Sequence, residues 1–224
     1  MRNGKPAVTS SPGSRRTAAP TDGELLDAAL VVFAERGYRQ ATMELIAERA
    51  KSTKPTLYAH FGGKETLYDT VFAREVDRLR GWVLAVYDSA GDEALEQLVR
   101  RYVMALFDYA VAHPQSFRML FGSDPGAERA SRHQPVVDAI SERVEEQVRN
   151  FLTALGRTPG PSAGLLAAIL VALTGGAARH VQHSGKIDPA AAGELATALI
   201  MAAINGLDPS MLDAIDGAAG SAGG

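Results

Sequence analysis

The 224-residue chain contains no cysteine and only one tryptophan. Without cysteine it can form neither a disulfide nor a thiolate metal site, and it has no cysteine nucleophile. A glycine-rich phosphate loop, a nucleophile elbow and a metal-ligand cluster are also missing. His180 and His183 lie one helical turn apart, but no carboxylate or cysteine stands beside them at ligand spacing. We therefore expect no metal, no other cofactor and no enzyme; a turnover assay with candidate metabolites would test the remote alternative, a helical enzyme.

Long apolar runs are missing as well. The longest, Leu165 to Leu173, falls far below the roughly 20 residues that a membrane-spanning helix needs. The N-terminal residues carry positive charge but lack the apolar core of a secretory signal. We therefore expect no membrane partner and a buried helix within the uncharged stretch between Arg157 and Arg179. The lack of cysteine also fits a reducing cytoplasm.

Acidic residues are absent from the first twenty positions, which contain four basic residues and many Ser, Pro and Gly. Such a segment buries too little apolar surface to fold, so residues 1–20 are predicted to form a flexible basic arm. Residues 1–66 contain ten basic and seven acidic residues, whereas the remainder contains thirteen basic and nineteen acidic residues. The front of the chain therefore has the charge that suits a nucleic-acid partner.

Apolar residues recur with a helical period along most of the chain, and no alternating strand pattern persists. The sequence predicts an all-α protein of about nine helices, with an N-terminal three-helix domain over 21–66 and a larger helical domain over 67–208. The segment 209–224, rich in Ala and Gly, is predicted to be a largely disordered tail. The helices expected after the fourth, which begins near Lys64, cover 92–113, 115–121, 135–155, 162–183 and 189–207.

Two short predicted helices, 43–50 and 54–61, form a helix-turn-helix whose second helix enters the major groove. Leu57 and Phe61, at i and i+4, point back at the first helix and hold the second one down. Pro55 is tolerated in the first turn, because its missing N–H has no partner there. A surface helix with ordinary polar residues remains an alternative interpretation. The polar side chains left on other faces, some of them outward, are Lys54, Thr56, Tyr58 and His60.

The segment Leu25 to Phe72, LLDAALVVFAERGYRQATMELIAERAKSTKPTLYAHFGGKETLYDTVF, resembles the DNA-binding domain of the TetR family of bacterial transcriptional regulators. KPTLYAH is similar to the recognition helix of the founding tetracycline repressor. Lys51 departs from the pattern, since most members have glycine there, and we expect it to adopt a positive φ at some energetic cost. The resemblance fades after about residue 75. The matching signals are Phe33 with Gly37-Tyr38, Thr42, Ile46-Ala47 with Ala50, and TLYAHFGGKETL.

The resemblance implies a cytoplasmic, nucleoid-associated dimer that binds a palindromic DNA operator through two half-sites about 34 Å apart. By position, it implies phosphate contacts for Thr42, Tyr58, His60 and Lys64, and places Lys54, Pro55 and Thr56 nearest the base edges. Arg15 and Arg16 could follow the minor groove, or the arm could simply be solvated. The full predicted DNA-binding set is Thr42, Lys51, Thr53, Lys54, Pro55, Thr56, Tyr58, His60 and Lys64.

The last two predicted helices combine small residues, which let helices approach closely, with leucine and isoleucine. In TetR-like proteins these helices pair with their copies in a four-helix bundle, so the resemblance implies a homodimer. The alternative is that they form only the core of a monomer. The predicted dimer interface is Leu166, Ala168, Ala172, Leu173, Gly176, Leu199 and Ile200.

Bulky aromatic residues alternate with isolated polar groups in the middle helices, as they do in apolar small-molecule pockets. An aromatic stripe at helical spacing is more often core, so both interpretations stay open. The resemblance implies a repressor that an apolar or aromatic inducer releases from DNA through a shift of the fourth helix. Control by a protein partner, or by no ligand, is the alternative, and ligand-dependent thermal shift separates them. The predicted ligand-binding residues are Trp82, Tyr102, Phe107, Tyr109, Phe117 and Phe121.

Overall fold

The computed structural model describes residues 20–88, 94–122 and 127–221. Throughout these ranges the regular structure is helical, which confirms the predicted all-α class. Nearly all of the predicted basic arm lies outside the described residues. The helices are α1 (Asp22–Gln40), α2 (Met43–Arg49), α3 (Lys54–Phe61), α4 (Lys64–Asp88), α5 (Leu95–Ala112), α6 (Pro114–Phe121), α7 (Ala127–Ala154), α8 (Ser162–Ser184), α9 (Pro189–Gly206) and α10 (Pro209–Ser221).

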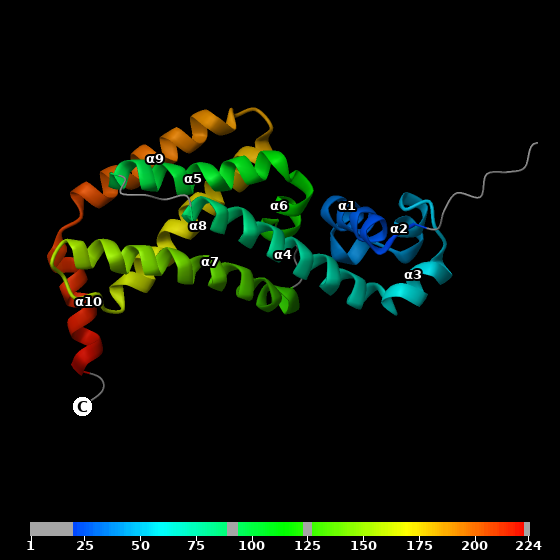
Figure 1. The fold of residues 1–224 in the computed structure, drawn as a ribbon, viewed down its shortest axis with the longest axis horizontal. Helices are drawn as coiled ribbons and strands as arrows, with labels where there is room; N and C mark the ends of the chain where they lie inside the picture. Colours follow the sequence, from blue (N-terminus) through cyan, green and yellow to red (C-terminus); the bar gives the residue numbers. More distant parts are fainter. Residues whose placement is uncertain (1–19, 89–93, 123–126, 222–224) are drawn as a thin grey trace, which may run out of the picture.

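Figure 1 shows a small group of helices, α1 to α3, at one end of the molecule and a larger group, α5 to α10, at the other. Helix α4 starts beside α3 and runs into the larger group. Helix α1 packs against α2, α4 and α6, while α5 packs against α4, α8 and α9. Helix α4 is therefore the element that extends from the small group deep into the large one.

The small group forms because each helix has a strong local start. Thr21 and Glu24 make a reciprocal capping box at the beginning of α1. Thr42 and Thr53 cap α2 and α3 through hydrogen bonds that their side-chain oxygens accept from the backbone. Gly37, with φ at 70°, breaks the helical geometry of α1 near its C-terminal end.

The C-terminal segment differs from its prediction, because residues 209–221 form helix α10 instead of a disordered tail. Leu212 is buried there in a small apolar cluster with Leu152 and Ala163. Burial of this side chain, together with polar contacts to the start of α8, supplies the order that the Ala- and Gly-rich composition does not indicate. The total is therefore ten described helices, against about nine expected, and α7 begins at Ala127 rather than near residue 135.

Helix α8 is less buried than predicted. It is long and apolar enough to cross a membrane by length and composition, yet only 28% of its apolar window is buried within the protomer. One face packs against α7, α9 and α5 through small residues such as Ala163, Ala167 and Ala178. The opposite face exposes Leu165 and Leu173. The protomer therefore covers one side of α8 and leaves an apolar side open.

Candidate nucleic-acid interface

Helix α3 is held onto α2 by its apolar side, as the sequence predicts. Leu57 is fully buried, and Phe61 packs against the same core. The Thr53 side chain accepts a hydrogen bond from the Thr56 backbone N–H at 3.3 Å and orders the first turn. Pro55 lies in that first turn, where its missing N–H leaves no bond unmade. The other sides of α3 are left for contacts with a partner.

The structure brings the predicted DNA-binding residues together on α3 and the adjoining ends of α2 and α4. Tyr58 is 46% exposed, which leaves a large aromatic ring on the surface of a helix whose Leu57 is buried. Thr56 and Lys64 are partly buried. The remaining members of the set are exposed: Thr42, Lys51, Thr53, Lys54, Pro55 and His60.

Acidic partners within this surface were missed by the sequence reasoning. The Lys54 ammonium forms an ion pair with the carboxylate of Glu44 on α2. The hydrogen bond and charge of Glu44 raise the pKa of Lys54, and the same hydrogen bond lowers the pKa of Glu44. His60 Nδ1 lies 2.5 Å from Asp22 Oδ1 at the start of α1. The signal available in the sequence was the presence of acids in the first turns of α1 and α2, within an otherwise basic region.

Lys64 begins α4 directly after a tight turn. Gly62 makes that turn with φ at 73°, a conformation that a side chain would strain. The Lys64 Nζ lies 4.3 Å from the centre of the Tyr38 ring and 3.4 Å from the Arg39 carbonyl oxygen. A cation at the N-terminus of a helix, held by an aromatic ring, is well placed to contact a phosphate.

Lys51 adopts φ at 49°, which confirms the positive φ expected where most members have glycine. The Ser52 N–H donates to the Ala47 carbonyl at 2.8 Å, and the Lys51 N–H donates to the Glu48 carbonyl at 3.1 Å. This pair of bonds is a Schellman motif with lysine at the left-handed position. The motif ends α2 and directs the chain into α3, with the exposed Lys51 side chain at the turn.

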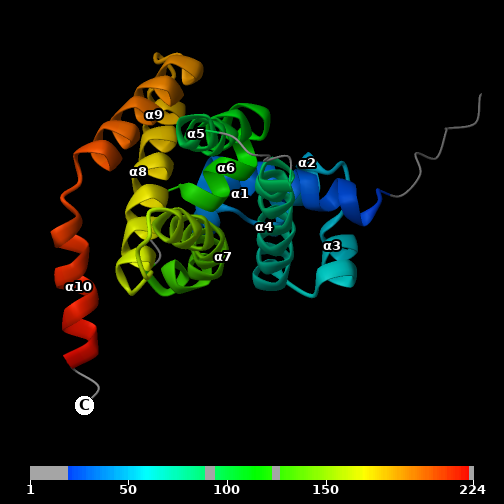
Figure 2. The ribbon, with the colours of Figure 1, turned by 60° about the vertical axis from the view of Figure 1, so that its left-hand side comes forward.

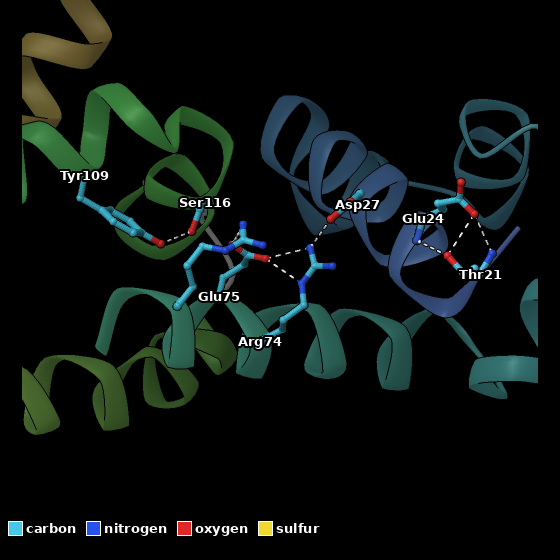
Figure 3. A network of polar contacts seen from close by, with 8 residues as sticks. Thr21, Glu24, Asp27, Arg74, Glu75, Tyr109 and Ser116 are labelled. Atoms are coloured by element: carbon cyan, nitrogen blue, oxygen red, sulfur yellow. Dashed lines mark hydrogen bonds and ion pairs between the residues drawn. The ribbon is translucent and has the colours of Figure 1, made fainter. Parts of the chain in front are cut away.

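A charged network joins the small helical group to α4 (Figure 3). Glu75 is fully buried, and its carboxylate accepts hydrogen bonds from Arg74 Nε at 2.9 Å and Arg78 Nη1 at 2.8 Å. Arg74 also lies within 2.9 Å of Asp27 on α1. Glu75 is not among the functional residues predicted from the sequence, although its two flanking arginines at i−1 and i+3 are a usable signal. The network ties the orientation of α1 to that of α4.

An apolar cavity of about 110 Å³ lies among α4, α5, α6, α7, α8 and α9. Two of the predicted ligand-binding residues, Tyr102 and Phe121, line it. The aliphatic majority was not predicted, because such side chains look the same in a core and in a pocket. The lining residues are Val83, Val86, Val99, Tyr102, Val103, Ala105, Leu106, Phe121, Val144, Leu170, Val171, Thr174 and Ile200.

The other four predicted ligand-binding residues do not line this cavity. Phe107 and Tyr109 are almost fully buried in the core, where the Tyr109 hydroxyl hydrogen-bonds to Ser116, and burial raises the pKa of Tyr109. Trp82 donates from Nε1 to the Ala105 carbonyl at 2.9 Å and thereby braces the cavity wall. Phe117, fully buried in the core, lines a separate cleft of about 660 Å³ between α6 and α8, along with Phe121, Arg118, Arg179, His180 and His183.

Five of the seven predicted dimer residues lie on the open side of α8 and α9, namely Ala168, Ala172, Leu173, Gly176 and Leu199. Leu173 is 58% exposed and Leu199 is 62% exposed. The protomer itself covers the other two to different degrees. Ile200 is 5% exposed and lines the cavity, so it belongs to the protomer's own core. Leu166 is partly buried and packs against the cluster that anchors α10.

Comparison with known proteins gives a consistent assignment. The model of bacterial regulatory proteins of the tetR family matches residues 25–71. The transcriptional activator FasR of Mycolicibacterium smegmatis is 33% identical over 176 residues, which cover 79% of this chain and 78% of FasR. The chain belongs to the TetR family. The transcriptional repressor KstR2 of Mycobacterium tuberculosis H37Rv is 28% identical over 135 residues, or 60% of this chain and 64% of KstR2.

Solved structures of transcriptional regulators share most of the fold. A TetR-like regulator from Rhodococcus sp. RHA1 superposes with a TM-score of 0.69 at 22% identity, covering 83% of this chain and 96% of that one. The regulator FadR from Bacillus subtilis, solved in complex with stearoyl-CoA, superposes with a TM-score of 0.67 at 15% identity, covering 80% and 97%.

As a TetR-family member the protein is a DNA-binding transcriptional regulator, and its family match spans α1 to α3 and the start of α4. The residues that face outward from these helices therefore lie in the part of the chain that defines the family. FasR is named as an activator and KstR2 as a repressor, so relatives differ in the direction of their control.

Proposed function

We propose that the protein is a cytoplasmic homodimeric repressor that an apolar small molecule releases from a palindromic operator. The single observation that carries the ligand response is the extent of α4. Lys64 and Arg74 on this helix contact the small helical group, and Val83 and Val86 on the same helix line the apolar cavity. The two functions of the proposed regulator are therefore joined by one continuous helix.

In this proposal the domain over 21–66 grips DNA and the domain over 67–208 binds ligand and the second copy. Lys54, Pro55 and Thr56 read base edges, while Thr42, Lys51, Thr53, Tyr58, His60 and Lys64 contact the backbone. Support comes from their common location on the surface of α3 and its flanks. Two copies held through the open faces of α8 and α9 would present two recognition helices to half-sites about one helical turn apart.

The size of the cavity supports a mechanical response. Ligand pockets typically measure roughly 300 to 1,000 Å³, so an occupant of that size must part the walls of a cavity of about 110 Å³. One of those walls is α4, and Val83 lies roughly 28 Å along the helix from Lys64 at 1.5 Å per residue. A small tilt at Val83 therefore displaces the DNA-binding end, and the Arg74–Asp27 ion pair carries α1 with it.

The chemistry of the lining supports an aliphatic ligand. Tyr102 and Thr174 supply the only hydroxyl groups among the lining residues, and the Thr174 hydroxyl donates to the Leu170 carbonyl at 2.9 Å. FadR of Bacillus subtilis, which shares the fold, was solved with stearoyl-CoA, a molecule with a long aliphatic chain. We therefore propose an effector that buries an aliphatic chain between α4, α5 and α8. Control by a protein partner, or by no ligand, remains the competing proposal.

The test begins with selection of bound sequences from random DNA, followed by a screen for metabolites that release the selected operator. An effector should raise the melting temperature and weaken operator binding in fluorescence anisotropy. A shift from 99:1 to 1:99 in operator binding requires a preference of about 5.5 kcal/mol for the released form. Leu170→Trp should fill the cavity and abolish the response while DNA binding persists, and the exposed Val111→Trp serves as the matched control. A protein that binds its operator but answers to no metabolite contradicts the proposed ligand response.

A further inference from the structure

We infer that α10 is a third helix of the dimer interface and packs against a second copy of this chain. This inference rests on the proposed homodimer through α8 and α9, and it adds a surface that the family resemblance does not assign. The residues that carry it are Met211 and Ile215, which α10 leaves exposed, and Leu212 and Asp216, which fix the helix in place.

Helix α10 is attached to its own protomer by specific contacts. Asp216 accepts hydrogen bonds from the Ser162 N–H at 2.8 Å and from the Ser162 hydroxyl at 2.9 Å. The residue at the N-cap position of α8 is Pro161, which makes no side-chain capping bond, so Asp216 supplies the cap from α10. Arg157 forms an ion pair with Asp213 and also donates to the Pro209 carbonyl at 3.2 Å.

The close fit at this junction also limits the position of α10. A Cβ on Gly160 would lie only 2.4 Å from a carboxylate oxygen of Asp216. Leu212, 5% exposed, adds apolar contact beside these polar bonds. Helix α10 is therefore oriented with respect to α8, and its outward side chains have a defined direction.

The outward flank of α10 is apolar. Met211 is 60% exposed and Ile215 is 37% exposed, and their i, i+4 spacing places them on one flank of the helix. Asp213 and Asp216 point to the flank that contacts the same protomer. Seven of the twelve large apolar side chains exposed in the described part of the chain lie on three consecutive helices: Leu165, Ile169, Leu173, Leu195, Leu199, Met211 and Ile215.

Helix α10 adjoins the open side of α8: Leu166, two turns before the exposed Leu173, packs against the cluster that contains Leu212. Figure 2 shows α8, α9 and α10 gathered at one side of the molecule, away from α2 and α3. From Ser162 to Ala178, α8 carries no charged residue, and Glu194 on α9 is paired with Arg100 on α5. A large, uncharged, apolar surface is typical of an obligate interface between identical chains. Because a two-fold interface places the same patch on both copies, each α10 would lie against its partner.

The absence of native cysteine allows a test that leaves the surface almost unchanged. Single-cysteine variants of the full chain, Met211→Cys, Leu173→Cys and Val111→Cys, are alkylated at protein concentrations above and below the dissociation constant of the dimer. Burial of a thiol against a second copy should slow alkylation by about tenfold or more at the positions 211 and 173 when the dimer forms. Val111 is 60% exposed near the C-terminal end of α5, the end that leads into α6 and lies away from α10 (Figure 1), and its rate should not change.

The outcomes separate this inference from the proposed homodimer. Protection of Leu173→Cys without protection of Met211→Cys overturns the role of α10 and leaves the α8–α9 dimer intact. A chain that sediments as a monomer at micromolar concentration, with neither position protected, overturns both. Protection at Met211→Cys only after addition of phospholipid vesicles also overturns the inference. As a second measurement, Ile215→Glu should raise the dimer dissociation constant about tenfold or more, whereas Val111→Glu should not.

Discussion

The two ends of the molecule use opposite kinds of surface. On α2 and α3 the proposed contacts are polar groups such as Tyr58 and Lys54, held outward by a fully buried Leu57. At the other end the proposed contacts are themselves apolar, both around the cavity and on the open face of α8. Substitutions in the first region should therefore change DNA recognition with little effect on folding, whereas substitutions around the cavity should change both ligand binding and folding.

Helix α4 is the exception to this division, because it carries a fully buried charge between the two regions. The Glu75 side chain has no access to solvent, so its carboxylate is stabilised by the ion pairs with Arg74 and Arg78 instead of by water. Removal of one partner from a buried ion pair leaves an uncompensated charge, which destabilises far more than the loss of a surface pair. The boundary between the two regions is therefore the place where a single substitution should have the largest effect.

Glu75→Ala should lower the free energy of unfolding by about 3 kcal/mol, the low end of the range for a broken buried pair. The low end applies because Arg74 and Arg78 are 25% and 36% exposed and can regain water. Chemical denaturation measures the effect. Asp77→Ala, an exposed acid on the same helix, is the control and should change stability little. Equal stability of the two variants would contradict the structural role of the network.

The second prediction concerns the phosphate contacts. Tyr58→Ala combined with Lys64→Ala should weaken binding to all DNA by about 2 kcal/mol and reduce the salt slope of the dimer by about two, one phosphate contact per protomer. Anisotropy titrations at several salt concentrations measure both quantities. Lys186→Ala, which changes an exposed lysine in the loop between α8 and α9, is the control. An unchanged salt slope would show that Lys64 does not contact a DNA phosphate.

Local chemistry explains which features the sequence could predict. Thr53 caps α3 through a bond to Thr56, and the positive φ of Lys51 follows from the short turn between two helices. Both depend on neighbours a few residues away. Helix α10 depends instead on a bond between Ser162 and Asp216, which are 54 positions apart. The cavity could not be predicted either, because its valines and leucines are the same residue types that fill a core.

The third prediction distinguishes base recognition from contacts to the DNA backbone within α3. Lys54→Ala should alter the preferred operator sequence and lower discrimination at one base pair by about 1 kcal/mol or more, while binding to random DNA changes less. Glu44→Gln should change the preference as well, because the carboxylate holds the Lys54 ammonium in the free protein. Repeated selection from random DNA measures both. Identical preferences in wild type and both variants would show that other residues read the sequence.

The smallest expected effect lies at the one described residue other than glycine with a positive φ. The left-handed conformation costs a side-chain-bearing residue about 1–2 kcal/mol, and glycine loses about 0.5–1 kcal/mol more backbone entropy on folding. Lys51→Gly should therefore raise the free energy of unfolding by about 0.5 kcal/mol, and Lys51→Ala should not. Because the same change removes a positive charge from the proposed interface, binding to DNA should weaken as stability rises. A parallel rise in stability and affinity would show that Lys51 contributes nothing to the DNA contact, so this substitution tests whether the departure from glycine serves recognition at the expense of folding.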